Sequence, residues 1–328
     1  MTCFWLAELA FSLLMYVVLD GFDLGVGVLS GFAGDTQRRD VMVASISPVW
    51  DGNGTWLVIA GATLFGAFPD VYALLLPAFY LPLAGMLIGL IARGVAIEFR
   101  HKTVRGRWIW NVCFFAGSLL AAFMQGAAVG AYAQGLPVQN MEFVGTGLEW
   151  ATPFSLWCGL SLVLGYGLLG AGWLALKTEG DVQAFGYVAI GRLLWMTLLA
   201  EAVVFATTIV SHPQVAARWH EHRALYVLPV AGLLASLGIA YGHRNHALRL
   251  SFCMTVLLFA VSFLALAASF LPYIVPFSVT LREAAAPASS QTFMFWGAGL
   301  FVMPMVVGYT WVAYRVFRGK VDAAHTYH

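Results

Sequence analysis

Charged residues are scarce in this chain: Asp, Glu, Lys and Arg make up only 10% of its 328 residues, whereas 61% are hydrophobic. An ordinary soluble domain has about 25% charged residues, so the composition excludes that class. The net formal charge is only +1, which gives no electrostatic reason to expect a nucleic-acid partner. Apolar runs of about 20 residues recur through the whole length, which leaves no room for a sizeable soluble domain. The sequence therefore predicts one all-α integral membrane domain over residues 1–328.

Patterns that hold metals are also lacking. The four cysteines form no C-x-x-C motif and fall in separate apolar segments, so neither a metal site nor a disulfide framework is indicated. A haem in a helical bundle usually takes an axial histidine from the interior of a helix. None of the eight histidines lies in the middle of an apolar segment; they are His101, His212, His220, His222, His243, His246, His325 and His328. The chain thus offers no interior histidine to a haem.

Nine apolar segments are present, each long enough to cross a membrane as a helix. Their approximate ranges are 3–31, 48–68, 71–98, 108–134, 152–176, 184–211, 223–242, 248–273 and 291–315. Ser47 and Pro48 suit the start of the second helix, and Phe68 and Pro69 suit its end. The sequence therefore predicts nine transmembrane helices with short connections.

Basic residues are distributed unevenly between the two sets of alternate loops. One set, with the carboxyl-terminal tail, holds Arg38, Arg39, Arg100, Lys102, Arg105, Arg107, Lys177, Arg244, Arg249, Arg315, Arg318 and Lys320. The other set holds only Arg218, Arg223 and Arg282. Lys and Arg accumulate in cytoplasmic loops, so we expect the amino terminus outside and the carboxyl terminus in the cytoplasm. The first segment lacks a basic n-region and an A-x-A site, which favours a retained helix over a cleaved signal.

Three carboxylates lie within or at the ends of these apolar segments. Asp20 and Asp23 are three residues apart and share a face of the first helix, and Asp51 lies about one turn into the second. All three fall towards the expected cytoplasmic side, where they are predicted to border one polar opening. An ionisable group at membrane depth costs on the order of 3 kcal/mol or more, so it indicates a path for protons, ions or charged ligands.

Structural roles for the same acids stay open. An acid in the first turn of a helix, such as Asp51, is stabilised by the helix dipole by about 0.3 to 1 kcal/mol. Asp20 and Asp23 can pair with Arg93 of the third helix or with arginines of the adjoining loop, because intramembrane charges usually find partners. Glu8 is expected near the outer surface, where solvation or snorkelling accounts for it.

Two segments are specific in combination: VLDGFDLGVG at residues 18–27 and PVWDGNGTW at residues 48–56. Together with LFGAFP at 64–69, RGVAIEFR at 93–100, and the segments 271–278 and 289–291, they resemble subunit II of the cytochrome bd type quinol oxidases. The likeness covers essentially the whole chain. Residues 15–27 and 177–180 are most similar to the cyanide-insensitive branch. One departure is Gly54, where many relatives carry Glu or Gln.

The resemblance implies a heterodimer in the bacterial cytoplasmic membrane that oxidises quinol and reduces dioxygen to water. Subunit I would carry the haems, two of b type and a third of type d or b. Subunit II would form two four-helix bundles, about residues 1–135 and 150–320, with one peripheral helix in the second part. Some members hold a structural quinone in subunit II. The resemblance leaves open whether a small accessory single-helix subunit joins the complex.

The resemblance also assigns the aspartate of the WDGN motif to a cytoplasmic proton path, which makes Asp51 the predicted point of proton uptake. Residues of the same motifs would support it; these are Asp20, Asp23, Trp50, Asn53, Trp56, Arg93, Glu98 and Arg100. Two other classes stay open: an ion- or proton-coupled secondary transporter with acids at broken helices, and a structural scaffold in which all three acids can be neutralised without effect. Neither explains the DGFDLGVG and WDGN pair.

Overall fold

The computed structural model of the chain describes residues 1–103 and 105–321. In this part, eight helical segments are long and apolar enough to cross a membrane. They are α1 (Thr2–Ser30), α5 (Tyr80–Arg100), α6 (Arg107–Gln134), α7 (Pro153–Lys177), α8 (Gly180–Ser211), α10 (Val227–Arg244) with the short 3₁₀ turn Arg223–Tyr226 before it, α11 (Leu248–Phe270), and α12 (Ala288–Met294) continued by α13 (Val302–Val316). The prediction of an all-helical membrane protein is confirmed for the described residues.

Shorter elements join these helices. The helices are α2 (Thr36–Ile46), α3 (Trp50–Ala67), α4 (Pro69–Ala78) and α9 (Pro213–Glu221), with a 3₁₀ turn at Glu149–Ala151. Two antiparallel hairpins pair β1 (Val138–Gln139) with β2 (Glu142–Phe143) and β3 (Tyr273–Val275) with β4 (Val279–Thr280). Helices α2 and α9 were not predicted from the sequence, because both are too short for a membrane span and carry several polar residues.

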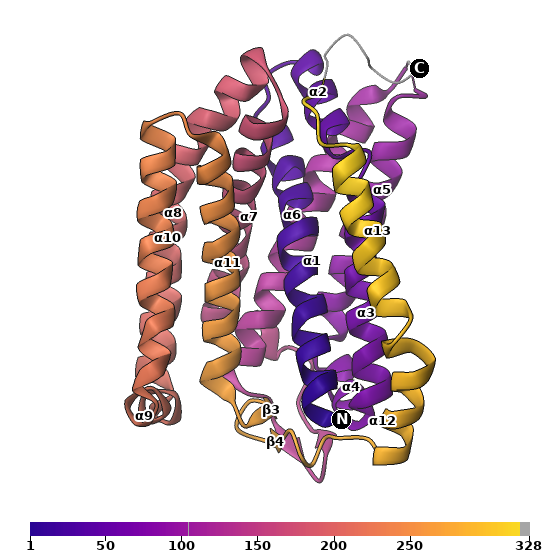
Figure 1. The fold of residues 1–328 in the computed structure, drawn as a ribbon, viewed down its shortest axis with the longest axis vertical. Coiled ribbons are helices and arrows are strands. Elements are labelled where there is room, and N and C mark those ends of the chain that lie inside the picture. Colours follow the sequence, from indigo (N-terminus) through magenta and orange to yellow (C-terminus); the bar gives the residue numbers. More distant parts are fainter. Residues whose placement is uncertain (104, 322–328) are drawn as a thin grey trace.

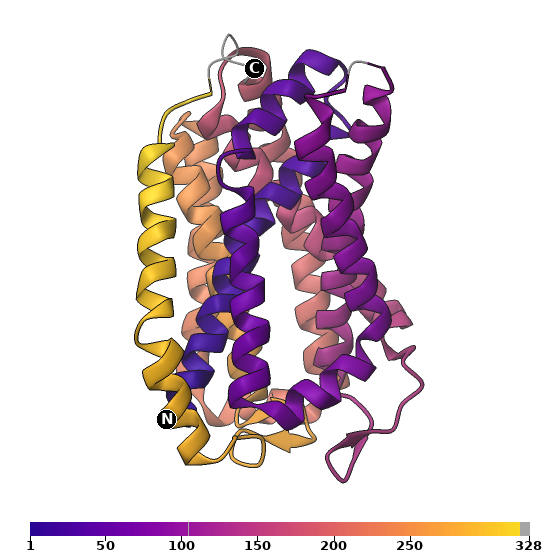
Figure 2. The same cartoon turned by 90° about the vertical axis from the view of Figure 1, so that its right-hand side faces the viewer.

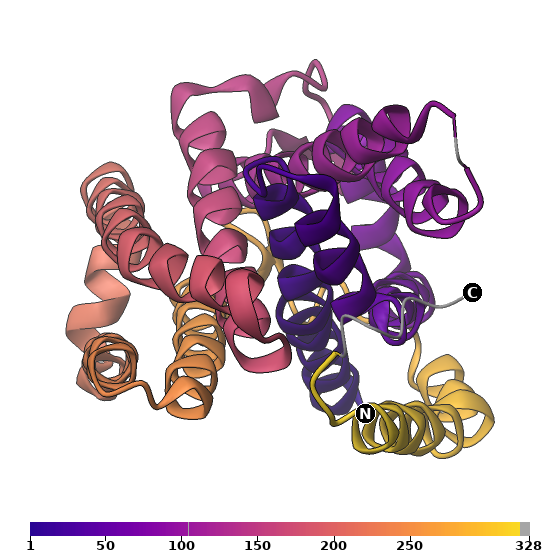
Figure 3. The same ribbon diagram turned by 90° about the horizontal axis from the view of Figure 1, so that it is seen from above.

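The long helices stand side by side and run in alternating directions (Figure 1, Figure 2). One end of the bundle carries α2, and the other carries both α9 and the hairpin β3–β4; we call these the α2 end and the hairpin end. Seen along the long axis, the orange helices α10 and α11 lie at one side and the yellow α13 at another edge, with the indigo α1 between them (Figure 3). The amino terminus lies at the hairpin end (Figure 1).

Helix α3 corresponds to the second predicted span, but it begins at Trp50 rather than at Pro48. The Ser47 hydroxyl donates to Val43 O over 2.9 Å, so this serine closes α2 instead of opening the next helix. The predicted end is confirmed, because α3 stops at Ala67 and Pro69 starts α4. At about 1.5 Å per residue, the 18 residues of α3 extend about 27 Å. Polar residues in the first two turns of α3 lower its mean hydropathy, so α3 is not among the eight segments apolar enough to cross a membrane.

The third predicted span, 71–98, is in fact two helices that meet at Phe79. Pro82 explains the break, because it has no N–H to donate to Ala78 O, and its ring crowds that carbonyl. Phe79 has φ −110° and ψ 20°, outside the helical range, and α5 starts at Tyr80. Because of this break, the axis of α4 does not set the direction in which the polar side chains of α5, such as Arg93 and Arg100, point.

Glycines allow close packing of α1 against α7. A Cβ atom built on Gly25 would lie 1.8 Å from the Tyr166 carbonyl oxygen, and one on Gly170 would lie 2.4 Å from the carbonyl carbon of Gly25. No side chain fits at either position unless the helices separate. Small residues drive close helix contact in membranes, where helices gain little hydrophobic free energy from association. This contact fixes the position of α1, which carries the three acids that are buried in the described part of the chain, Glu8, Asp20 and Asp23.

We expect Gly25→Leu to prevent assembly of the bundle, because even its Cβ atom overlaps backbone atoms of α7. Overpacking inside a well-packed core typically costs about 1–3 kcal/mol, and an overlap with rigid backbone belongs at or above the upper end. The measurement is the yield of monodisperse, membrane-extracted protein. Gly308→Ala is the control, since no atom lies within 4 Å of a Cβ at that position; equal yields for the two variants would contradict the close contact.

Candidate functional site

An ion pair is fully buried between α1 and α5. Arg93 Nη1 lies 2.8 Å from Asp20 Oδ1, and the side chains are 3% and 0% exposed. Arg93 belongs to the buried face of α5, which repeats every three or four residues and also contains Met86, Gly89 and Ile97. The helical period therefore points a guanidinium into the interior, where a carboxylate must compensate its charge.

Asp23 lies on the same face of α1 and is held by a second set of contacts. Asn53 Nδ2 of α3 donates to Asp23 Oδ2 over 2.8 Å and to Leu19 O over 3.3 Å. The Tyr314 hydroxyl of α13 donates to Asn53 Oδ1 over 2.9 Å. Three helices that are far apart in sequence thus meet at Asp23, and α13 closes the cluster from outside.

The cluster has one more carboxylate than it has cations. Asp20, Asp23 and Arg93 together carry a formal charge of −1 when both acids are ionised. Asp23 Oδ1 and Arg93 Nε are buried and have no hydrogen-bond partner among the described residues. A buried polar atom without a partner costs about 1–3 kcal/mol, so water or a proton is needed at this point. The arrangement can hold one proton that is not fixed by a cation.

The two tryptophans of residues 48–56 make different contacts. The Arg93 Cζ atom lies 6.0 Å from the centroid of the half-buried Trp50 ring, within reach of a cation–π interaction. Trp56 is completely buried and packs edge to face on Phe11, with ring centroids 5.5 Å apart. Trp50 thus lies beside the ion pair, whereas Trp56 packs nearer the start of α1.

Asp51 differs from the other two acids in being exposed, although it lies in the first turn of α3 at the α2 end. Asn53 is only two residues away, but it points inward because two residues turn an α-helix by about 200°. The expectation that all three acids border one opening is therefore wrong for the isolated chain. Asp51 faces outward, and Asp20 and Asp23 are enclosed.

Arg100 and Glu98 do not join this cluster. Arg100 is 1% exposed; it binds Asp40 of α2, and its Nε donates to Asn111 Oδ1 over 2.6 Å. Arg107 Nη2 also donates to Asp40 Oδ1, over 2.7 Å. Glu98 is exposed on α5. Arg100 thus joins α2, α5 and α6 at the α2 end of the bundle.

The charge of this second cluster reaches its neighbour His101. Burial, reinforced by the positive charge of Arg100, lowers the pKa of the His101 imidazole. The side chain is therefore neutral at pH 7. His325 and His328 lie outside the described residues. Among the described residues, no group of three or more His, Cys, Asp or Glu side chains is placed to hold a metal ion.

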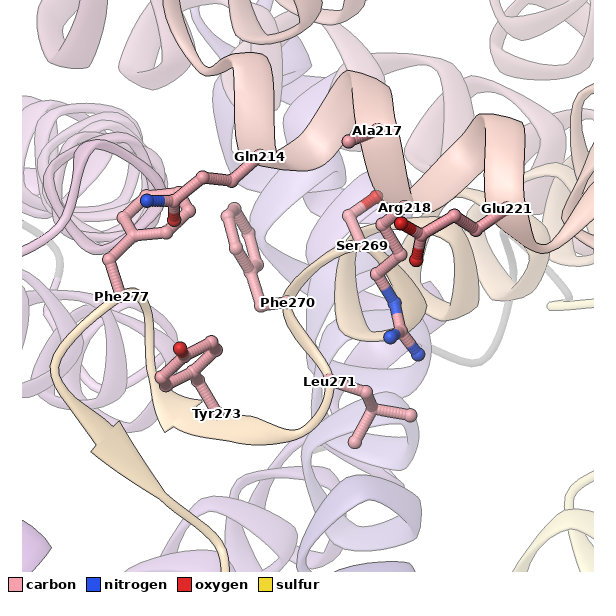
Figure 4. Close-up of a pocket in the computed structure, with 9 residues that line it drawn as sticks. All are labelled: Gln214, Ala217, Arg218, Glu221, Ser269, Phe270, Leu271, Tyr273 and Phe277. Carbon is pink, nitrogen blue, oxygen red and sulfur yellow. The ribbon is translucent and has the colours of Figure 1, made fainter.

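A cavity of about 270 Å³ lies at the hairpin end, between α9, the end of α11 and β3 (Figure 4). Aromatic rings of Phe270, Tyr273 and Phe277 line it, and Arg218 Nε at its edge donates to Ala268 O over 2.7 Å. None of the residues predicted from the sequence contributes to this cavity.

Glu8 is 6% exposed, so the expectation that it is solvated near the outer surface is wrong. The Ser12 hydroxyl donates to its carboxylate over 2.9 Å. A signal was present, because Glu8, Ser12, Tyr16 and Asp20 repeat at intervals of four and so share one helical face. Glu8 therefore belongs with the buried acids of α1.

Comparisons with known proteins place these features in a family context. Residues 1–317 match the family described as cytochrome bd terminal oxidase subunit II. The cytochrome bd-I ubiquinol oxidase subunit 2 of Escherichia coli K12 is 29% identical, over 95% of this chain and 93% of that protein. A probable cytochrome oxidase subunit 2 of Haemophilus influenzae is 27% identical, over 97% of this chain and 94% of that protein.

A solved structure gives a likeness at the level of the fold. A chain in the bd oxidase of Geobacillus thermodenitrificans superimposes with a TM-score of 0.78, covering 96% of this chain and 98% of that chain. The sequence identity is only 16%, so this match supports the fold alone.

We expect Arg93→Leu to lower the yield of folded protein severely, because it leaves Asp20 as an uncompensated buried charge. Removing one partner of a buried pair typically costs about 3–5 kcal/mol. The double variant Asp20→Asn/Arg93→Leu removes both charges and should recover part of the loss. Thermal stability of the membrane-extracted protein measures this; a double variant no more stable than Arg93→Leu would contradict the pairing.

Proposed function

The chain belongs to the cytochrome bd terminal oxidase subunit II family, and from this we propose that it is the haem-free subunit of a membrane complex that oxidises quinol and reduces dioxygen to water. The observation that carries the proposal is the family match over residues 1–317, nearly the whole chain. Its partner is then a subunit I that bears the haems. The chain contributes a scaffold and a route for cytoplasmic protons.

We further propose nine membrane crossings, with α3 as the ninth. Helices α1, α3, α5 and α6 then form a first bundle within residues 1–135, and α7, α8, α10 and α11 form a second within 150–320, with α13 peripheral. The α2 end faces the cytoplasm in this proposal, since the excess of Arg and Lys falls there. The amino terminus is then outside and the carboxyl terminus in the cytoplasm.

Asp51 is the proposed point of proton uptake. It is exposed at the α2 end, and its carboxylate lies in the first turn of α3, where the helix dipole stabilises a negative charge. A carboxylate at this place accepts a proton from cytoplasmic water and passes it towards the subunit interface. Reduction of one dioxygen to two water molecules consumes four protons and four electrons, and oxidation of quinol would supply the electrons.

The enclosed residues support this role by fixing α3. Asn53 ties the first turns of α3 to Asp23 of α1, while Arg93 holds Asp20 and packs against Trp50. These contacts set the direction in which Asp51 points. Glu98 and Arg100 lie on the last turn of the same α5, where Arg100 anchors α2 through Asp40.

Some members of the family hold a structural quinone in this subunit, and the cavity of Figure 4 is the place to test. Its aromatic lining suits a quinone ring. However, its volume of about 270 Å³ is below the roughly 300–1,000 Å³ of most ligand pockets, and Arg218 already donates to Ala268 O. We therefore assign no quinone to this cavity.

A secondary transporter remains the alternative class, but the structure offers it little support. A coupling ion would sit at broken helices near the membrane centre. Helix α13 is preceded by a π-helical turn at Phe295–Gly299, yet it is peripheral and has no fully buried residue. The buried acids lie on α1, which is continuous from Thr2 to Ser30.

We expect the complex purified through a tag on this chain to show haem bands in a reduced-minus-oxidised visible spectrum, together with a larger partner. The haems would belong to that partner. A colourless, lone polypeptide from cells that express the partner would contradict the oxidase proposal and favour the transporter.

We expect Asp51→Asn to slow oxygen consumption at least about 10-fold, because an amide cannot carry the proton that a positioned acid–base group transfers. The haem spectrum should stay unchanged, since Asp51 is exposed and supports no buried contact. Asp70→Asn is the matched control, as Asp70 is also an exposed acid in the first turn of a helix, α4, but at the hairpin end. Equal turnover in both variants would rule out the role of Asp51.

A further inference from the structure

Helix α1 carries a buried stripe of polar side chains along most of its length. Its members are Glu8, Ser12, Tyr16, Asp20 and Asp23, and none is more than 6% exposed. Their spacing of four, four, four and three residues places them on one face. At about 1.5 Å per residue the stripe extends about 22 Å, compared with a hydrocarbon core of about 30 Å.

Helix α3 presents a matching face. The buried residues of this helix are Asn53, Trp56, Ala60, Thr63 and Ala67, so three of the five carry a polar group. Because α1 and α3 run in opposite directions, the two faces meet in order. Asn53 donates to Asp23 at one end, and Thr63 lies beside the Glu8 carboxyl at the other. We call this contact the α1–α3 seam.

Several polar atoms of the seam are buried without a hydrogen-bond partner among the described residues. They include Glu8 Oε2, Tyr16 Oη and Trp56 Nε1. The Ser12 hydroxyl and the Glu8 carboxylate are in direct contact, at 2.9 Å. Elsewhere on the stripe, side chains four residues apart have Cβ atoms about 5–6 Å apart, which is close enough for one water molecule to bridge their polar groups. Water at such places would satisfy the unpartnered atoms.

Glu8 has no structural reason to be ionised and buried here. Its carboxylate receives a hydrogen bond from Ser12, and none of the ion pairs among the described residues includes it. An unpaired buried charge is expensive, whereas a protonated carboxyl group can be buried without a cation and can exchange its proton with a neighbouring hydroxyl group. Glu8 is thus an interior carboxyl group near the hairpin end, in contact with the Ser12 hydroxyl.

We propose that the α1–α3 seam conducts protons from the acid cluster of Asp20 and Asp23 to Glu8. This inference rests on the proposed oxidase function, which requires protons from the cytoplasmic side. A proton that reaches the cluster passes to a seam water, which gives one of its own protons onward. The Tyr16 and Ser12 hydroxyls relay it in the same way, each receiving one proton and releasing another. Glu8 is protonated last and passes its proton to the partner's oxygen-reducing site, where the proton is consumed in forming water; no proton is consumed within the seam.

The test is Glu8→Gln in the complete complex. We expect oxygen consumption to fall about 10-fold, less than the roughly 100-fold that a positioned acid–base group commonly contributes, because water replaces part of the relay. The solvent deuterium isotope effect on turnover should rise, and the haem spectrum should not change. Glu8→Asp keeps the carboxyl group and should retain most of the activity.

Glu201→Gln is the matched control. Glu201 is also an intramembrane glutamate that receives a serine hydrogen bond, from Ser262, but it lies on α8, away from the seam. It should leave both turnover and the isotope effect unchanged. If Glu201→Gln slows turnover as much as Glu8→Gln does, the effect is not specific to the seam and the proposal fails.

The outcomes separate this inference from the oxidase proposal. Normal turnover in Glu8→Gln with slow turnover in Asp51→Asn would overturn the seam and leave the uptake role of Asp51 intact. Absence of haem from the purified complex would overturn the oxidase function itself. If Glu8→Gln fails to assemble, Ser12→Ala is the second test, because this variant removes only one hydroxyl group. We expect Ser12→Ala to raise the solvent isotope effect on turnover. An unchanged isotope effect in this variant would overturn the proposal.

Discussion

The pairing of Arg93 with Asp20 is the constraint on which the first half of the molecule depends. A guanidinium buried among membrane helices must have a carboxylate at hydrogen-bond distance, and this requirement fixes α5 against α1. The close approach of α1 to α7 at Gly25 then leaves no freedom for α1 to move away. These two contacts set the position of Asp23 on α1, and Asn53 then ties the first turns of α3 to Asp23.

The polar interior and the glycine contacts serve the same arrangement in different ways. Glycines bring backbones together where dispersion is the main attraction between membrane helices. Polar side chains, by contrast, need hydrogen-bond partners, and in the α1–α3 contact Asn53 of α3 supplies one to Asp23 of α1. Helix α1 therefore has one face with glycine contacts, against α7, and one polar face, against α3.

Much of the fold could be predicted from the sequence, because membrane helices are recognised by the length and hydropathy of their apolar segments. The errors in the predicted helix boundaries have local causes. Pro82 divides one predicted span, and Ser47 ends a helix rather than starting one. Helices α2 and α9 are too short to be recognised from hydropathy. At the site, the sequence motifs included Asp20, Asp23, Asn53 and Arg93, which the structure brings together; the roles proposed for them stay predictions. Which acids are enclosed depends on tertiary contacts. The four-residue spacing of Glu8, Ser12, Tyr16 and Asp20 indicates a shared face, but it does not show that this face is buried.

The peripheral position of α13 has a consequence for extraction into detergent. The helix has no fully buried residue, so few contacts hold it on the bundle. Its Tyr314 hydroxyl donates to Asn53, which in turn donates to Asp23. A detergent that displaced α13 would therefore remove one partner of Asn53 and alter the surroundings of the acid cluster, while the other helices kept their contacts with one another.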